Sequence, residues 1–473
     1  MVRGGTLLAL ASGLLGCNTL FGIDRVVVVC ETGADCASGF CRPDFTCDDG
    51  QWVQHFPGKV MPPLFVEAIA GSDGRSRIVI AGSFEEELEL GDITLQSAGG
   101  VEGFVAMLDD AGTTIWATRL GGPGDQWATA LSADNGRILV GGSFMDGLEG
   151  GGLSIQAPSP SPATHGYVAA LDPSGRASWV SVIAGTETVG ITDVLDTSMG
   201  IVAVGSYVGR ASLAGTALEE SGGVRWGHLS GFDDAGQAVA FVSMRATGGL
   251  TPLRIAEDGL TGSAVYVAGD FAGQIEDGPS SGSDVDVFRL TVTNEIANYS
   301  VATGNAEETL LGFGSDNDGR NVMALRVGNA GAGVEFVAVA RTVTNNLDGA
   351  TATNTYESDS ADFANIASLV MATNDDAVIA GEARGTIDLD GVDLSADDED
   401  AFFVRIAEDG EPLLPTLRRF RGPGTDRAND VAVDGEHGVV IGTFESRLTV
   451  GNDDGSVTLE NTGSPELFVS RLR

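Results

Sequence analysis

A short apolar run that ends in a small-residue turn recurs along most of the chain. Each run is a few aliphatic residues long, which suits a short buried strand and is too short for a core helix. The copies are Ile78–Phe84, Ile138–Phe144, Ile201–Tyr207, Val265–Phe271, Val378–Glu382 and Val439–Phe444. The pattern predicts β-strands that are separated by tight turns and repeat at long intervals.

A second recurring signal is an apolar strand that closes on Asp and a Gly turn, with an aromatic residue four positions after the Gly. The clearest copies are Phe104–Asp109 with Gly112 and Trp116, and Tyr167–Asp172 with Gly175 and Trp179. Aligned on this strand, seven copies have their anchor positions at Phe104, Tyr167, His228, Asp286, Phe336, Phe402 and Phe468. A period of about 60 residues suits four short strands, which is one blade of a β-propeller.

The two ends of the repeated region complement each other. The last copy stops at Leu472, directly after its third strand, whereas Trp52 lies before the first copy where a fourth strand belongs. An N-terminal strand that completes the last blade removes two exposed sheet edges. An open solenoid, the weaker alternative, needs capping repeats at both ends. We therefore predict an all-β, seven-bladed β-propeller that is closed by an N-terminal strand.

The N-terminus has the features of an export signal. Arg3 precedes an apolar stretch, Thr6–Leu15, that is too short to span a bilayer, and the stretch ends in Leu14-Leu15-Gly16-Cys17. This ending resembles the bacterial lipobox, which implies a lipid on Cys17, and Asn18 after it favours the outer membrane. An ordinary secretory peptide with a chance Cys is the alternative. We expect a signal peptide over 1–16, a lipid-anchored linker over 17–50 and the propeller over 51–473.

Four further cysteines crowd into the linker, at Cys30, Cys36, Cys41 and Cys47. An even number of closely spaced Cys in an exported chain predicts two disulfides, in any of three pairings. A zinc site is disfavoured because the spacings contain no C-x-x-C pair. The propeller is thus expected to follow a small disulfide-rich segment.

The repeat units resemble the SBBP-type β-propeller repeats of exported bacterial proteins, and the lipobox makes the whole similar to the repeat lipoproteins of myxobacteria. The turns Gly121–Asp125 and Gly422–Asp426 match the Gly-Gly-x-Gly-x-Asp part of that pattern. The resemblance covers about residues 51–473 and implies the fold. It supplies no shared catalytic residue.

The chain is strongly acidic, with 67 Asp and Glu against 26 Lys and Arg and a formal charge of −41. This balance excludes ordinary nucleic-acid binding, which requires an excess of basic residues. Lys59 is the single Lys, so no polybasic membrane patch exists. We interpret the charge as a solvating surface and expect a monomer.

Calcium is the one metal with candidate residues, and no cofactor is predicted. Asp316 and Asp318 lie in a run that approaches a calcium loop but is one ligand short, and Asp388–Asp393 alternates along what we interpret as one strand. Asx turns explain such Asp-Gly pairs without a metal.

Catalytic motifs are missing from the sequence. Its four His (His55, His165, His228 and His437) are scattered without a paired motif, and we interpret them as solvent-facing or strand residues. The Asp-x-x-Gly turns have a different spacing from the Asp boxes of sialidases. We expect Trp52, Trp116 and Trp179 to cover outer strands, and we favour packing over ligand stacking for Trp127 and Trp226.

The leading functional hypothesis is a non-catalytic binding module for protein or glycan partners at the cell envelope. The Ala157–His165 insertion and the Asn345–Asp362 connection are the predicted contact loops. Two alternatives stay open: a calcium-dependent envelope hydrolase that uses the propeller funnel, and a purely structural surface-coat protein.

Overall fold

The computed structural model describes residues 50–472 except for short internal stretches. The stretches outside the description are 72–73, 135, 159–161, 277, 279, 294–296, 303–306, 318–319, 329–334, 343–350, 358–362, 386–387, 390–391, 394–395, 409–411, 436, 453–454 and 462–464. Within the described residues, every regular element is a β-strand apart from one short 3-10 helix, η3 (Leu414–Thr416). This part of the chain has no helix that is long and apolar enough to cross a membrane.

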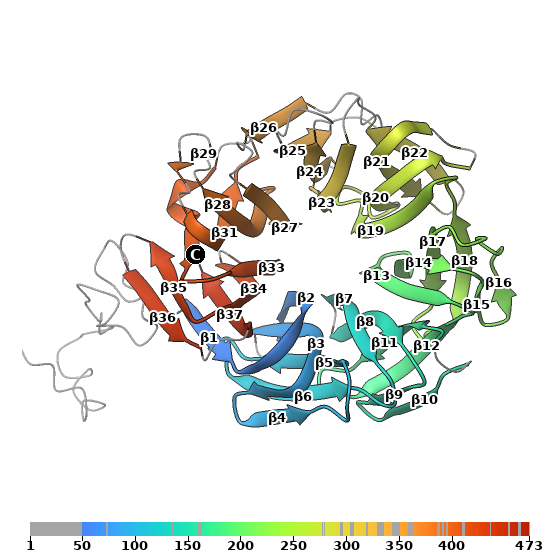
Figure 1. The fold of residues 1–473 in the computed structure, drawn as a ribbon, viewed down its shortest axis with the longest axis horizontal. Helices are drawn as coiled ribbons and strands as arrows, with labels where there is room; N and C mark the ends of the chain where they lie inside the picture. The colour runs from blue at the N-terminus through green and yellow to red at the C-terminus, as the bar shows by residue number, and fades with distance from the viewer. Residues whose placement is uncertain are drawn as a thin grey trace, which may run out of the picture.

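The described strands form seven antiparallel meanders of four strands around a common axis (Figure 1). We number the sheets 1 to 7 in the order of their innermost strands. These are β2 (Gly58–Ala70), β7 (Gln126–Asp134), β13 (Thr188–Thr197), β19 (Gly249–Glu257), β23 (Glu307–Ser315), β27 (Phe363–Met371) and β33 (Arg427–Asp434). Each inner strand contacts the next one, and β33 contacts β2, so the ring is closed.

The remaining strands follow outward in the same order in every sheet. The second strands are β3 (Ser76–Leu90), β8 (Arg137–Phe144), β14 (Gly200–Val208), β20 (Val265–Gln274), β24 (Asn321–Gly328), β28 (Ala377–Gly385) and β34 (His437–Phe444). The third strands are β5 (Glu102–Leu108), β11 (His165–Leu171), β17 (Trp226–Phe232), β21 (Ser280–Val292), β25 (Glu335–Thr342), β31 (Ala396–Ile406) and β37 (Glu466–Leu472). Every predicted anchor position lies on a third strand.

The fourth, outermost strands include the N-terminal one. They are β6 (Thr114–Leu120), β12 (Ala177–Gly185), β18 (Ala238–Met244), β22 (Ala297–Ala302), β26 (Thr351–Glu357), β32 (Arg418–Arg421) and, for sheet 7, β1 (Trp52–Phe56). β1 pairs antiparallel with β37, from Trp52 opposite Arg471 to Phe56 opposite Leu467. The prediction of an all-β propeller closed by an N-terminal strand is confirmed.

The core is divided into layers between neighbouring sheets. Phe104 and Ile80 of sheet 1 share a buried cluster with Ile441 and Leu467 of sheet 7. The third strands β5, β11, β17 and β37 are covered on both faces, and all seven residues of β5 are buried. Sheet-on-sheet packing of this kind explains why the strand runs are almost continuously apolar.

Short hairpins extend several sheets at the rim. They involve β4 (Ile93–Gln96), β9 (Gly147–Gly150), β10 (Leu153–Gln156), β15 (Ala211–Leu213), β16 (Thr216–Ala217), β29 (Asp388–Leu389), β30 (Val392–Asp393), β35 (Arg447–Asn452) and β36 (Gly455–Glu460). The β15–β16 hairpin leaves sheet 3 and pairs with β12 of sheet 2, and β35 leaves sheet 7 and pairs with β32 of sheet 6. Each of these two hairpins covers the outer edge of the preceding sheet.

Three tryptophans join neighbouring sheets in the same way, and we call each contact a tryptophan latch. The ring lies against the turn glycine of the next sheet, and its Nε1–H donates to a carbonyl of that turn at 2.9–3.1 Å. The pairs are Trp52 with Gly112, Trp116 with Gly175, and Trp179 with Gly236. These tryptophans lie on outer strands as expected, but the ring contacts the next sheet rather than simply covering its own.

Two local expectations need correction, and a third, that the histidines are solvent-facing or strand residues, is narrowed to the strand alternative for His165 and His228. The Asn345–Asp362 connection is not all loop, because it contains β26. Asp388–Asp393 forms two short strands that pair with each other rather than one strand. His165 and His228 lie on strands but are fully buried, because the third strands β11 and β17 are covered on both faces.

Candidate functional site

Every inner strand has a register shift, where one residue, or three (62–64) in β2, has no partner on the second strand. The shifts lie at Met61/Phe65, Ala128/Ala130, Ile191/Asp193, Pro252/Arg254, Leu310/Gly312, Ile366/Ser368 and Ala428/Asp430. A β-bulge redirects the side chains beside it. The first residue that is paired again after the shift therefore lies at an equivalent position on all seven inner strands, which we call the bulge level.

Charged residues at this level, or two positions beyond it, gather at the ring axis. Asp193, Arg254 and Asp430 occupy the bulge level in sheets 3, 4 and 7, and Glu67 lies two positions further along in sheet 1. The charge of Asp430 contributes to the raised pKa of Asp193 although their sheets are not neighbours, so the interaction crosses the interior of the ring. We call Glu67, Asp193, Asp430 and Arg254 the axial cluster.

Main-chain hydrogen bonds hold two of the carboxylates in place. Asp193 accepts the Ile255 N–H of sheet 4 at 2.7 Å, and Asp430 accepts the Val66 N–H of sheet 1 at 2.9 Å. Both bonds connect an inner strand with that of the next sheet. The two carboxylates therefore have fixed positions as well as structural partners.

The pKa values in the axial cluster are raised, chiefly because burial disfavours the charged form. Burial raises the pKa of Asp193 to about 6, although Arg254 and the bonded N–H groups oppose the rise. Burial, followed by repulsion from Asp430 and Asp193, raises the pKa of Glu67 well above its usual value. The pKa of Asp430 is also raised by burial.

The composition of the cluster determines what it can bind. The cluster holds three carboxyl groups and one guanidinium, and Asp134 adds repulsion on Glu67, so full ionisation leaves excess negative charge in a half-buried place. Such a place favours a proton or a cationic ligand, and perturbed carboxyl groups of this kind mark candidate functional sites. An ammonium or guanidinium group would compensate the excess charge.

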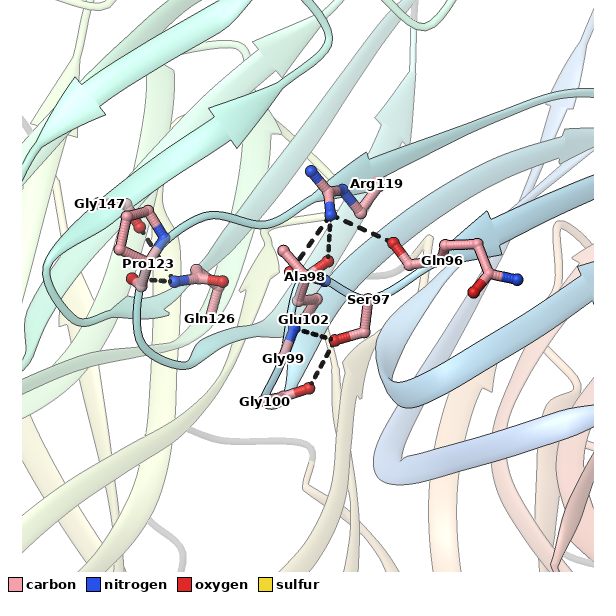
Figure 2. Close-up of polar contacts among 10 residues, drawn as sticks. All are labelled: Gln96, Ser97, Ala98, Gly99, Gly100, Glu102, Arg119, Pro123, Gln126 and Gly147. Carbon is pink, nitrogen blue, oxygen red and sulfur yellow. Dashed lines mark hydrogen bonds and ion pairs between the residues drawn. The ribbon is translucent and has the colours of Figure 1, made fainter.

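A second polar region is the junction between sheets 1 and 2 (Figure 2). Glu102 is buried there, and Arg119 Nη1 lies 3.1 Å from its Oε2, while the Ala98 N–H donates to Oε1 at 2.9 Å. Gln126 is also buried, and its Nε2 donates to the carbonyls of Pro123 at 2.8 Å and Gly147 at 3.1 Å. The Gln126 bonds hold the turn before β7, whereas Gln126 Oε1 has no hydrogen bond from the described residues.

The sequence candidates for calcium fall in different situations. Asp316 is buried at the turn before β24, where Oδ1 accepts the Arg320 N–H at 2.8 Å and Oδ2 accepts Arg320 Nε–H at 2.7 Å. Asp318 lies outside the described residues. Arg320 thus neutralises Asp316 without a metal, and a calcium site there stays a prediction. Among the described residues, no three His, Cys, Asp or Glu side chains are grouped as metal ligands.

The lipidation and disulfide candidates all precede the described part of the chain. Cys17, Cys30, Cys36, Cys41 and Cys47 lie outside the described residues. Their roles stay predictions.

His55, His228 and Trp226 are engaged in contacts within the fold. His55 Nε2 lies 2.6 Å from Glu466 Oε2, and burial lowers the pKa of His228 to about 4. Trp226 lies under the Arg245 guanidinium, 5.6 Å from the ring centroid. These contacts agree with the packing role that we favoured for Trp226.

The axial cluster was missed in the sequence because 67 acidic residues offered no basis for a choice. One signal was present. Aligned copies place Asp193-Val194 and Asp430-Val431 at the same point of the inner strand, and both carboxylates reach the next sheet. Glu67 and Arg254 have no residue of the same type at the equivalent position of another copy.

Comparisons with known proteins add little beyond the fold. No known family model matches the sequence, and no curated protein matches it. Among solved structures, YCF48 bound to D1 peptide is 10% identical, with a TM-score of 0.38 over 92% of this chain and 98% of that one. A polysaccharide lyase of family PL25, an ulvan lyase, is 12% identical, with a TM-score of 0.42 over 86% and 95%. The intramolecular trans-sialidase from Ruminococcus gnavus is 9% identical, with a TM-score of 0.35 over 86% and 94%. These structures are β-propellers, and likeness at this level assigns no ligand or reaction to the chain.

Proposed function

We propose that the chain is a lipid-anchored binding module of the cell envelope, and that its ring axis binds a cationic group of a partner protein. The observation that carries the proposal is the axial cluster, in which three carboxyl groups from three sheets are accompanied by one guanidinium, that of Arg254. A protein partner is favoured over a glycan because Lys and Arg side chains supply the positive charge that the cluster lacks. The Cys17 lipobox supports the envelope location.

The binding site is tested by calorimetric titration of the full chain with a tri-arginine peptide. Asp193→Asn/Asp430→Asn keeps the oxygens that accept the Ile255 and Val66 N–H groups but removes two charges. Its affinity is expected to fall at least tenfold, because a hydrogen bond to a charged group contributes about 1.5–3 kcal/mol. Glu86→Gln/Glu89→Gln removes two charges from exposed positions and is expected to change the affinity less than twofold.

Equal losses in the two double variants would show that the peptide binds the acidic surface in general and would refute the axial site. Turnover of a hydrolase substrate panel that is abolished by Asp193→Asn/Asp430→Asn would replace binding with catalysis. The anchor is tested separately. Cys17→Ser is expected to release the protein from membranes, and continued membrane association would refute the lipid.

A further inference from the structure

The turn before the inner strand occurs twice with the same Gly-Pro-Gly core. Gly122–Gln126 leads into β7, and Gly422–Asp426 leads into β33. The last residue of each turn makes the same main-chain bond to the preceding sheet: Gln126 N–H donates to Val101 O at 2.9 Å, and Asp426 N–H donates to Glu399 O at 2.7 Å. Gln126 and Asp426 are therefore equivalent positions.

The residues that face the two turns are equivalent as well. A Cβ built on Gly124 lies 3.0 Å from Met145 Cβ, and one built on Gly424 lies 3.0 Å from Glu445 Cβ. The junction between sheets 6 and 7 thus repeats the junction between sheets 1 and 2. It has carboxyl groups in place of an amide and a thioether.

In the junction between sheets 1 and 2, the side-chain amide of Gln126 donates hydrogen bonds to a group of main-chain carbonyl oxygens. Its Nε2 donates to Pro123 O at 2.8 Å and Gly147 O at 3.1 Å, and Met145 O lies at 3.5 Å (Figure 2 shows the first two). The side chain is fully buried, so these carbonyls have the amide as their positive partner.

In the junction between sheets 6 and 7, a carboxyl group has replaced that donor. Asp426 is 0% exposed, and neither of its side-chain oxygens has a hydrogen bond of ordinary geometry from the described residues. A Cβ built on Gly422 would lie 3.0 Å from Asp426 Oδ2 and 1.7 Å from Arg447 O. Two oxygens thus crowd one face of Gly422, and the main-chain N–H of Glu445 only partly offsets the cost of a buried negative charge there.

More carboxyl groups surround the same turn. Glu445 Oε2 and Asp398 Oδ2 each lie 3.5 Å from a turn N–H, those of Thr425 and Gly424. Burial, followed by repulsion from Asp400, raises the pKa of Asp426 to about 8. The nearby Arg427 is directed to Glu382 and Glu399, at 3.1 and 3.0 Å. The environment of Asp426 is therefore rich in oxygen and in negative charge.

We propose that this junction binds a divalent cation, with Ca²⁺ as the best fit, between sheets 6 and 7. The Asp426 carboxylate and the carbonyls of Pro423, Glu445 and Arg447, which correspond to the acceptors around Gln126, are the inner ligands. The Glu445 carboxylate completes the negative charge. An all-oxygen donor set with main-chain carbonyls is the kind that Ca²⁺ prefers, and it lacks the N and S ligands of zinc sites. The use of carbonyls also explains why no group of three acidic side chains marks the place.

The test is thermal unfolding and calorimetric titration of the full chain, stripped with EDTA and then supplied with CaCl₂. Wild type is expected to bind one Ca²⁺ at this junction and to show a higher Tm. Asp426→Asn supplies an amide like that of Gln126. It is expected to fold, to unfold no lower than calcium-free wild type, and to lose both the binding and the Tm shift.

Two further variants keep the proposal falsifiable. Glu445→Met restores the residue of the equivalent junction and is expected to weaken Ca²⁺ binding at least tenfold. Asp234→Asn removes one charge from an exposed position and is expected to keep the full Tm shift. No Ca²⁺ response in wild type, or the same response in Asp426→Asn, would overturn the proposal.

Discussion

The two halves of the ring are joined in different ways. The interfaces from sheet 7 to 1, 1 to 2 and 2 to 3 each have a tryptophan latch. On the outer strands of sheets 3, 4 and 5, the position that corresponds to the latch tryptophan holds Ala240, Ser300 and Asn354, none of which carries an indole. One half is thus latched by an aromatic ring on a glycine turn, and the other half has no such device at this position.

The half without latches has charged contacts between its sheets in place of latches, whereas the latched half has both kinds, with Arg137 of sheet 2 at 2.8 Å from Asp234 and 3.4 Å from Asp196 of sheet 3. Arg320 Nη2 of sheet 5 lies 2.6 Å from Glu408 Oε1 of sheet 6, and Arg427 of sheet 7 bridges Glu382 and Glu399 of sheet 6. Aromatic packing is insensitive to salt and pH, whereas ion pairs and buried carboxyl groups respond to both. The comparison therefore predicts that solution conditions affect one half of the ring more than the other.

The largest expected effect is that of pH on the stability of the half without latches. Burial raises the pKa of Asp270 to about 6 and that of Asp426 to about 8, whereas an unfolded Asp has a pKa of about 3.9. The folded state holds these protons more tightly, so its stability is fully present below pH 4 and is lost as pH rises through 6 and 8. In EDTA, the free energy of unfolding in urea is expected to fall over this window. Asp426→Asn should flatten the fall above pH 6, and an unchanged slope would contradict the assignment.

Removal of a latch is expected to have the next largest effect. Trp116→Ala deletes a partly buried ring and its bond to Pro173 O, and should lower the free energy of unfolding by about 3 kcal/mol. The loss is expected to be the same at low and high salt. A loss below about 0.5 kcal/mol, within the range of surface substitutions, would show that the latch does not join the sheets.

A matched pair of glycines separates the latch from backbone strain. Gly175 and Gly74 have almost the same positive φ, 78° and 76°. A Cβ on Gly175 would lie 2.6 Å from the Trp116 ring, whereas nothing lies within 4 Å of a Cβ on Gly74. Both Gly74→Ala and Gly175→Ala introduce the strain of a positive φ. Gly175→Ala should lower the free energy of unfolding by a further 1–3 kcal/mol, roughly the cost of overpacking. In the Trp116→Ala background this excess should disappear, and its persistence would place its cause outside the latch.

The smallest expected effect is that of a single ion pair. Arg427→Gln removes the bridge to Glu382 and Glu399, and because Arg427 is half-exposed the loss should be about 1 kcal/mol or less. The loss should shrink further in 1 M salt, unlike that of Trp116→Ala. A loss that is independent of salt would remove the contrast between the two halves.

The sequence predicted the architecture well because the latched half repeats its signals. Trp116 and Trp179 each follow a turn glycine at the same spacing, and Trp52 marks the strand that closes the ring. The half without latches lacks these markers, so β26 was taken for part of a loop. Its sheets are still four-stranded, because the apolar strand runs and the turns between them, rather than the aromatic latch, determine the meander.

The candidate site was much less predictable. Asp193 and Asp430 lie about 240 residues apart and meet only because the ring brings the bulges of distant repeats to one axis. The equivalence of Asp426 with Gln126 could have been found from the two Gly-Pro-Gly turns. Its meaning depends on the carbonyls around Gln126, which only the structure provides.

The most direct test of the axial site is the number of protons that leave the protein when a cation binds. Titration with tri-arginine at pH 6, in two buffers of different ionisation enthalpy, measures this number. Because Asp193 has a pKa of about 6 and Glu67 a raised one, binding in wild type should release roughly half a proton or more per peptide. Asp193→Asn/Asp430→Asn should release markedly less. Binding without proton release in wild type would contradict a site at the ring axis.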